Sequence, residues 1–137
     1  YFIESLDYWH DTDGELITIY SIVKEYSKKE NIEKVIEWCD KGLASIEENS
    51  SEKHKSFFYH FSIYKVIKEM DLNSEQLILS AIQHFESVKD YRYANKYSIL
   101  LGNIYSENRK YKNSALIYQK AVFYQFQLKY INSLEEL

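Results

Sequence analysis

Hydrophobic residues recur at helical spacing along almost the whole chain, and short polar segments interrupt the pattern. Apolar side chains three or four positions apart share one face of an α-helix, so the pattern predicts an all-α protein. Helices are expected over residues 15–28, 32–46, 52–69, 75–88, 91–107 and 110–129. Residues 1–9 fit the end of a leading helix that is broken at 11–14, and residues 130–137 fit a tail.

The six helices pair into three helical hairpins whose second helices carry apolar stripes. In the helix over 32–46 the stripe consists of Val35, Ile36, Cys39, Gly42, Leu43 and Ile46. In the helix over 75–88 it consists of Leu77, Ile78, Ala81, Ile82 and Phe85. Ser51, Ser74 and Asp90 are N-cap candidates, because short oxygen-bearing side chains accept hydrogen bonds from the first free N–H groups of a helix.

The third hairpin has the most informative spacing. It combines small and large residues in the order Leu101, Gly102, Tyr105, Ser114, Tyr118 and Ala121. The small residues let two helices approach closely, and the tyrosines fill the space that remains. This order resembles the tetratricopeptide (TPR) pattern L-G-x2-Y followed by A-x3-F, although Ser98 stands at the Trp position and no Pro closes the repeat. The alternative is a generic helical hairpin with a small-residue contact.

The pattern recurs upstream, which favours the TPR interpretation. Tyr26 in the first hairpin aligns with Tyr105, and Gly42 aligns with Ala121. The period is about 40 residues, longer than the roughly 34 of a standard TPR. We therefore expect a single domain, 1–137, that stacks three hairpins and a leading helix into a short TPR-like solenoid.

Composition narrows the functional classes. The 137 residues include no proline and three glycines, but fourteen tyrosines and seven phenylalanines, enough aromatics to fill inter-helix space and leave some for a binding face. The net charge of -4 argues against nucleic-acid binding, and no apolar run is long enough to span a membrane. The lone cysteine allows no internal disulfide and favours a cytoplasmic setting. Because the chain starts in mid-helix without Met, we expect a C-terminal fragment of a longer protein.

No catalytic constellation is found. The sequence lacks a phosphate-binding loop, a G-x-G-x-x-G and an H-E-x-x-H motif. None of its four histidines has a partner at metal-ligand spacing, and His54 and His84 are expected on solvated faces. Cys39 is interpreted as a small core residue. The sequence therefore predicts no catalytic residue, metal or cofactor, and no enzyme within this fragment.

A binding face is expected instead. The first helix of each hairpin in a stacked array lines a concave surface, which binds extended peptides in many such proteins. The candidate peptide-binding residues on it are Tyr20, Lys24, Lys28, His60, Tyr64, Lys68, Lys96, Asn103 and Glu107. Lysines attract carboxylates, aromatic rings receive apolar side chains, and the Asn103 amide can hold a peptide backbone group. The alternative is that these are ordinary exposed residues, with the aromatics closing the groove against a neighbouring hairpin.

Further motifs follow in a fixed order between Gly42 and Lys129. They are Gly-Leu-x2-Ile at 42–46, Lys-x-Phe at 55–57, Tyr-Lys at 64–65 followed by Glu69 and Asp71, Ile-x2-Phe-Glu at 82–86, and Tyr111-x3-Ala115-x2-Tyr118-x-Lys120-x-Val122-x2-Gln125. This order resembles the C-terminal repeats of the Rap family, the response-regulator aspartate phosphatases of Bacillus. It is also similar to the related peptide-sensing transcription factors of the same quorum-sensing superfamily. The resemblance covers about two-thirds of the chain.

The resemblance implies a function. Rap proteins combine an N-terminal bundle that engages a response regulator with a C-terminal TPR array that binds a short Phr peptide. The catalytic glutamine of the phosphatases lies in that bundle, which has no counterpart here, so no catalytic residue is carried over. The chain would then sense a signalling peptide for a longer regulator. The alternatives are a TPR scaffold for a protein partner without a peptide signal, and a regulatory part of a larger enzyme. An exposed apolar side at 1–9 would favour self-association.

Overall fold

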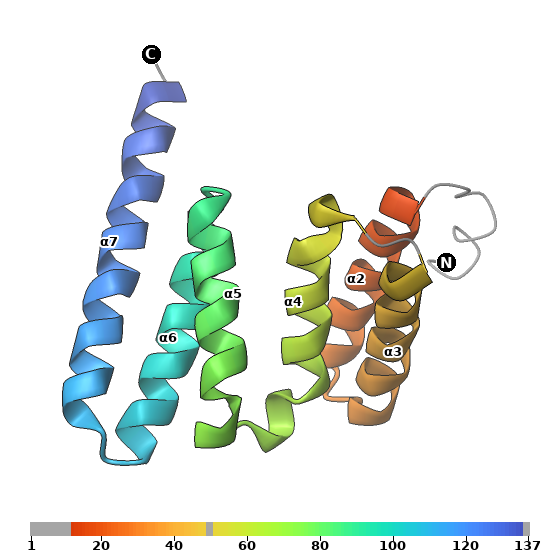
Figure 1. The fold of residues 1–137 in the computed structure, drawn as a ribbon, viewed down its shortest axis with the longest axis horizontal. Coiled ribbons are helices and arrows are strands. Elements are labelled where there is room, and N and C mark those ends of the chain that lie inside the picture. The colour runs from red at the N-terminus through yellow and green to blue at the C-terminus, as the bar shows by residue number, and fades with distance from the viewer. Residues whose placement is uncertain (1–11, 49–50, 136–137) are drawn as a thin grey trace. The chain divides into compact units, whose positions relative to one another are not determined.

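The fold is all-α, as predicted. The computed structural model describes residues 12–48 and 51–135, and these contain helices and turns but no strand. The α-helices are α2 (Thr12–Lys28), α3 (Ile32–Glu48), α4 (Lys55–Lys65), α5 (Glu75–Ser87), α6 (Tyr91–Glu107) and α7 (Tyr111–Glu135) (Figure 1). The predicted leading helix over 1–9 lies outside the described residues. The chain divides into two compact units, unit 1 up to Glu69 and unit 2 from Met70 onward.

Apart from α4, two helix ends differ from the prediction by more than two residues. α2 begins at Thr12, so Gly14 lies inside its first turn and does not end a preceding helix there. Asp13 and Glu15 suit this position, because carboxylates stabilise the positive end of a helix dipole. α7 continues through Glu135, so the tail predicted from residue 130 is helical up to that residue. No glycine or proline follows Lys129 to stop the helix.

The helix predicted over 52–69 is wrong as a single element. It consists of a one-turn 3-10 helix at Glu52–His54, then α4, then a second 3-10 turn at Ile67–Glu69. The break follows Lys65, where the Val66 N–H donates to the Ile63 carbonyl at 3.2 Å, an i to i+3 bond that tightens the last turn. Sequence reasoning missed this break because no glycine or proline marks it.

The same turn joins three helix pairs. Glu30, Lys89 and Arg109 follow α2, α5 and α6 with φ values of 57°, 60° and 59°, in the left-handed region. At each turn the next N–H donates back to a carbonyl five residues earlier, from Asn31 to Tyr26, from Asp90 to Phe85 and from Lys110 to Tyr105. This is the helix-ending bond of the Schellman motif. The shared bond at Tyr26 and Tyr105 agrees with the predicted alignment of the first and third hairpins.

The N-cap predictions are correct in position but not in bonding. Ser51, Ser74 and Asp90 all occupy N-cap positions, yet none of their side chains bonds a backbone N–H there. Asp90 instead accepts a hydrogen bond from Arg92 Nε at 3.4 Å. A cap that was not predicted precedes α3, where Asn31 Oδ1 accepts from the Lys34 N–H at 3.3 Å.

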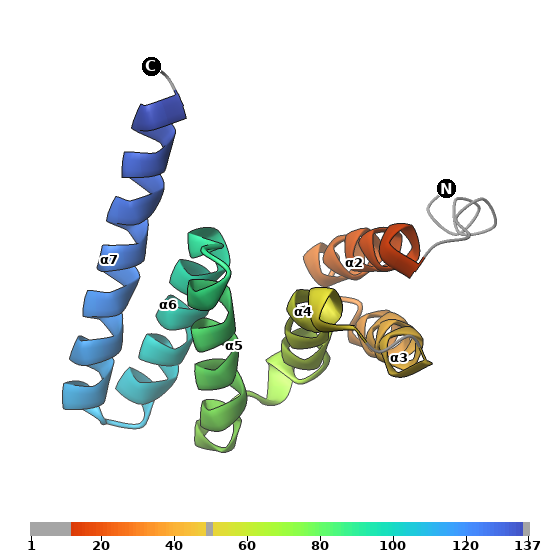
Figure 2. The same cartoon turned by 45° about the horizontal axis from the view of Figure 1, so that its top comes forward.

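Unit 1 consists of α2, α3 and α4, and its core lies where the three helices meet (Figures 1 and 2). Phe61 of α4 is fully buried and its ring lies against Gly42 of α3, where an added Cβ would overlap the ring. The predicted α3 stripe is mostly correct, because Val35 and Cys39 are buried. It is wrong at Ile36, which is exposed, and it omitted the buried Trp38. An ion pair between Lys65 Nζ and Asp40 Oδ1, at 2.6 Å, joins α4 to α3.

His54 is a further correction, because it is buried and not on a solvated face. Its Nε2 lies 2.6 Å from Asp13 Oδ1 at the start of α2, and Lys53 Nζ lies 3.2 Å from the other carboxylate oxygen. The hydrogen bond from His54 first, and that from Lys53 second, lower the pKa of Asp13. These contacts connect the start of α4 to the start of α2 within unit 1.

Unit 2 consists of α5, α6 and α7, which lie side by side (Figure 1). Its buried hydrophobic side chains are Ile78, Ala81, Ile82, Phe85, Ala94, Tyr97, Leu101, Ile104, Tyr105, Ile117, Ala121 and Tyr124. α6 and α7 cross closely at Gly102, where an added Cβ would overlap the Tyr118 ring. Ser114 Oγ donates to the Gly102 carbonyl at 3.0 Å, and Asn95 Nδ2 donates to the Ala121 carbonyl at 2.7 Å. The close approach predicted from the small residues is confirmed.

We expect Gly102→Ala to destabilise the fold by about 1–3 kcal/mol, because the new methyl group would overpack the α6–α7 contact. In a Tyr118→Ala background the same change should be neutral or stabilising by up to about 1 kcal/mol, since alanine is the better helix former. Urea unfolding followed by circular dichroism measures both. An equal loss of unfolding free energy in the two backgrounds would show that the Tyr118 ring is not what excludes a side chain at position 102.

We expect Asp13→Asn to lower the free energy of unfolding at pH 7. The folded-state pKa of Asp13 is lowered, so its ionised form stabilises the protein above the unfolded pKa of 3.8, and this stabilisation is lost as the pH falls through the folded pKa. The difference between variant and parent chain should therefore shrink between about pH 5 and pH 2. Thermal unfolding across this range tests it. In a Lys53→Ala variant, most of the pH-dependent stabilisation by Asp13 should remain, because His54 lowers its pKa more than Lys53 does. A difference in stability between Asp13→Asn and the parent chain that does not change with pH would contradict this role of Asp13.

Candidate functional site

The candidate residues of unit 1 fall into a buried group and an exposed group. Tyr20, His60 and Tyr64 are buried, with exposed fractions of 9%, 4% and 8%. The Tyr20 ring stacks on His60 at 4.6 Å between centroids, and Tyr64 meets its edge at 6.1 Å. These side chains join α2 to α4 and do not face solvent. Their position matches the alternative in which aromatics close the space between helices, and their role toward a peptide stays a prediction.

Lys24, Lys28 and Lys68 are exposed. Lys24 Nζ lies 4.7 Å from the centroid of the Tyr20 ring, close enough for a cation–π interaction. Lys28 Nζ lies 3.7 Å from Glu25, an exposed pair of small energetic weight. On α2, Ile17 is also exposed, seven residues or about two turns before Lys24. Unit 1 therefore presents three exposed basic side chains, of which Lys24 lies over the packed aromatic cluster.

In unit 2 the candidate residues all come from α6 and all are exposed. Lys96, Asn103 and Glu107 lie with the exposed Ile99 at spacings of three, four and four residues. Residues at these spacings lie along one face of a helix. The surface made of Lys96, Ile99, Asn103 and Glu107 is called the α6 face below. It carries an ammonium group, an apolar side chain, an amide and a carboxylate in that order.

Asn103 is held in place by a residue of α7. The Tyr118 hydroxyl donates a short hydrogen bond to Asn103 Oδ1. The amide nitrogen of Asn103 has no hydrogen-bond partner among residues 12–48 and 51–135. An oriented side-chain amide with a free N–H group can donate to a carbonyl of a bound chain. Sequence reasoning treated Tyr118 only as a filler of the helix contact and missed this bond, which depends on the side-chain conformations of both residues.

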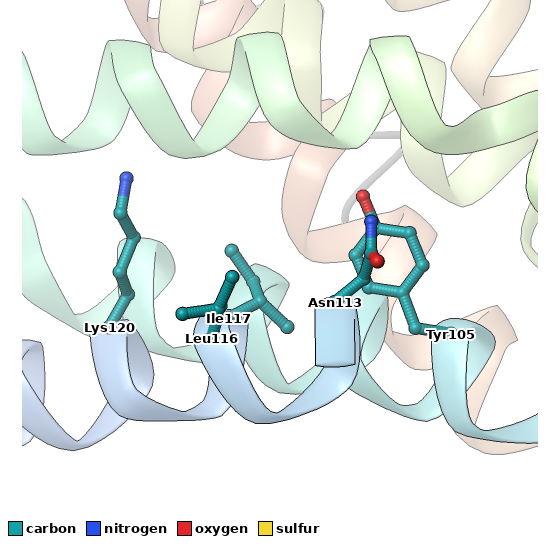
Figure 3. Close-up of a pocket in the computed structure, with 5 residues that line it drawn as sticks. All are labelled: Tyr105, Asn113, Leu116, Ile117 and Lys120. Atoms are coloured by element: carbon teal, nitrogen blue, oxygen red, sulfur yellow. The ribbon is translucent and has the colours of Figure 1, made fainter. Parts of the chain in front are cut away.

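A shallow pocket lies on another side of the same hairpin. Tyr105, Asn113, Leu116, Ile117 and Lys120 line it and enclose about 160 Å³ (Figure 3). Burial, and next the nearby carboxylate of Glu75, raise the pKa of Tyr105. This volume is below the roughly 300–1,000 Å³ of small-molecule sites, so the pocket suits one side chain or a few waters. None of the predicted site residues lines it.

Several chemistries find no support among the described residues. They contain no group of three or more His, Cys, Asp or Glu side chains placed to hold a metal ion. Cys39 is fully buried, and burial raises the pKa of its thiol to about 12. The thiol therefore stays protonated near neutral pH and acts as a small core group. No helix in the described ranges is long and apolar enough to cross a membrane.

The architecture is that of an all-α, TPR-like protein, and comparison with known proteins connects it to regulators of transcription. The chain is 24% identical over 125 residues to the transcriptional activator NprA of Geobacillus stearothermophilus. The match covers 87% of this chain and 30% of NprA, so the chain spans less than a third of that relative's length. No protein-family model and no solved structure matches the chain. The similarity supports a coarse link to this kind of regulator.

Proposed function

We propose that the chain is the peptide-binding module of a longer, peptide-sensing bacterial regulator. The observation that carries the proposal is the α6 face, on which Tyr118 orients the Asn103 amide. The resemblance to the repeats of Rap proteins and related peptide-sensing transcription factors supports the same function. The similarity to the transcriptional activator NprA supports a regulatory role for the longer protein.

The α6 face suits a short extended peptide. Lys96 and Glu107 are eleven positions apart, about 16 Å along a helix axis. That distance corresponds to about five residues of extended chain. Lys96 would attract a carboxylate, Glu107 an amine or a basic side chain, and Ile99 an apolar side chain. Asn103, between Ile99 and Glu107, would donate to a peptide carbonyl, so opposite charges at the two ends set the direction of the bound chain.

Unit 1 contributes a second proposed contact surface. Lys24, Lys28 and Lys68 would attract acidic side chains of a peptide or protein partner. The buried residues Tyr20, His60 and Tyr64 would contribute indirectly. Their ring contacts hold α2 against α4, and the Tyr20 ring lies under the ammonium group of Lys24. We propose these three aromatic residues as positioning residues for that surface.

The output of the longer protein is proposed from likeness alone. The similarity to NprA favours an attached part that regulates transcription in the cytoplasm. The resemblance to the Rap family favours an attached helical bundle that acts on a response regulator. The remaining alternative is a scaffold in which the same surfaces bind a protein partner and no signalling peptide is involved.

We expect Asn103→Ala to weaken binding of the cognate peptide by about 1–3 kcal/mol, because a peptide carbonyl would lose its buried donor. Tyr118→Phe should cause a smaller loss, since it removes only the bond that orients the amide. Asn132→Ala, an exposed change on α7, is the matched control and should leave the affinity unchanged. Helix content by circular dichroism should be the same in all three variants. Unaltered affinity of Asn103→Ala would remove Asn103 from the site.

The function itself is tested by isothermal titration with peptides of five to ten residues encoded beside the parent gene. Micromolar or tighter binding by the chain and by its longer parent is the expected result. Failure of every such peptide to bind the parent would overturn the peptide-sensing function and favour the scaffold. Binding by the parent that Asn103→Ala does not weaken would keep the function but place the site elsewhere.

A further inference from the structure

The pocket beside Tyr105 has a polar end, an apolar centre and a cationic end. Its α7 residues are Asn113, Leu116, Ile117 and Lys120. Figure 3 shows the side chains of Asn113 and Lys120 on the same side of α7, with Leu116 and Ile117 between them and Tyr105 of α6 beside Asn113. Seven residues of α-helix rise about 10 Å, which is the distance along α7 between the two ends of the pocket.

The polar end already has its hydrogen bonds. The side chains of Glu75 and Asn113 both bond the Tyr105 hydroxyl. Burial, and next the Glu75 carboxylate, raise the pKa of this hydroxyl, so it stays protonated near neutral pH and donates to Glu75, while the Asn113 amide donates to it. The Glu75 carboxylate would also repel a second carboxylate placed at this end. An anionic group of a ligand is therefore excluded from the polar end.

The cationic end has no such partner. The ammonium group of Lys120 forms no ion pair with any carboxylate of residues 12–48 and 51–135. Apolar walls lower the effective dielectric constant around a charge, so a carboxylate beside Leu116 and Ile117 would be attracted to Lys120 more strongly than in open water. The electrostatics of the pocket therefore favour a ligand that carries its negative charge at the Lys120 end.

The apolar centre sets the size of the ligand. Ile117 is buried and Leu116 is half-exposed, so together they form a wall that leads from the core of unit 2 to the surface. The pocket holds about 160 Å³. Apolar cavities of about 150 Å³ bind a molecule of the size of benzene, so about six carbon atoms fit. Leu116 and Lys120 are one helical turn apart, or about 6 Å, which matches a short aliphatic chain that ends in a carboxylate.

We propose that this pocket binds a short branched aliphatic group that carries a carboxylate. The aliphatic part would lie on Leu116 and Ile117, and the carboxylate would bind Lys120. A protein or peptide chain that ends in a leucine has this chemistry, and so does a free branched carboxylic acid of similar size. The pocket is distinct from the α6 face, because positions 103 and 105 lie about 200° apart around α6. The proposal therefore does not depend on the proposed function.

Titration of 4-methylpentanoate into the isotope-labelled 137-residue chain, followed by NMR, tests the pocket. We expect saturable chemical-shift changes centred on residues 113–120, with a Kd in the millimolar range that is usual for so small a ligand. The uncharged 4-methylpentanamide should bind about three- to tenfold more weakly, because it loses the attraction to Lys120. Equal affinity of the acid and the amide, or no saturable change up to about 50 mM acid, would overturn the proposal.

Two substitutions test the two parts of the pocket. Lys120→Gln should remove the advantage of the acid over the amide, and Leu116→Gln should weaken both ligands. Both residues are exposed, so the helix content measured by circular dichroism should not change. Lys129→Gln is the matched control, because nine residues are two and a half helical turns and place Lys129 on the opposite side of α7. Asn103→Ala should also leave the affinity unchanged, which separates this pocket from the α6 face. Binding of the acid that survives both pocket substitutions would contradict the assignment.

The tripeptide acetyl-Ala-Ala-Leu with a free carboxylate distinguishes the two sources of the ligand. Because it would use the same pocket, it should displace 4-methylpentanoate, and its C-terminal amide should displace the acid less well. Tighter binding of the tripeptide than of the acid would indicate a chain end as the ligand, and weaker binding would indicate a free carboxylic acid. Simultaneous binding of both compounds without competition would show that they do not share this pocket and would overturn the proposal.

Discussion

Unit 2 depends on how closely α6 and α7 can approach, and Gly102 sets that distance. The absent side chain leaves room for the Tyr118 ring against the backbone of α6. Ser114 Oγ donates to the Gly102 carbonyl at the same crossing, so the buried hydroxyl of Ser114 is paired. The Tyr118 hydroxyl then reaches across to Asn103. One tyrosine thus fills the helix interface with its ring and orients a surface amide with its hydroxyl, which links the packing of the unit to its candidate site.

In unit 1 a glycine also allows close helix packing, because the Phe61 ring occupies the space that a side chain at Gly42 would fill. The other contacts that hold unit 1 together differ from those of unit 2. An aromatic cluster around Tyr20 joins α2 to α4, and the buried His54 meets Asp13 at the ends of the helices. Aromatic stacking adds to the burial of aliphatic side chains in this core, while the charged group at the helix start makes part of the stability depend on pH.

Local patterns predicted much of this fold, and long-range contacts account for most of the errors. The bounds of α6 and the close approach at Gly102 followed from residue spacing within one hairpin. The burial of His54 could not be predicted in this way, because its partner Asp13 lies 41 residues earlier. The break after α4 was not predicted, because no glycine or proline marks it in the sequence. The α6 face could be placed by periodicity, but its bond to Tyr118 depends on side-chain conformations that no spacing reveals.

The three left-handed turns have a consequence for how the chain tolerates sequence change. Glu30, Lys89 and Arg109 adopt a backbone conformation that costs a side-chain-bearing residue about 1–2 kcal/mol relative to glycine. Each turn is kept because its helix-ending hydrogen bond and the packing of the flanking helices outweigh that cost. The protein therefore holds an unused reserve of stability at three equivalent positions, as expected of a sequence selected to fold adequately and not maximally. Losses of packing elsewhere in either unit could be offset by glycine at these turns without altering any surface discussed above.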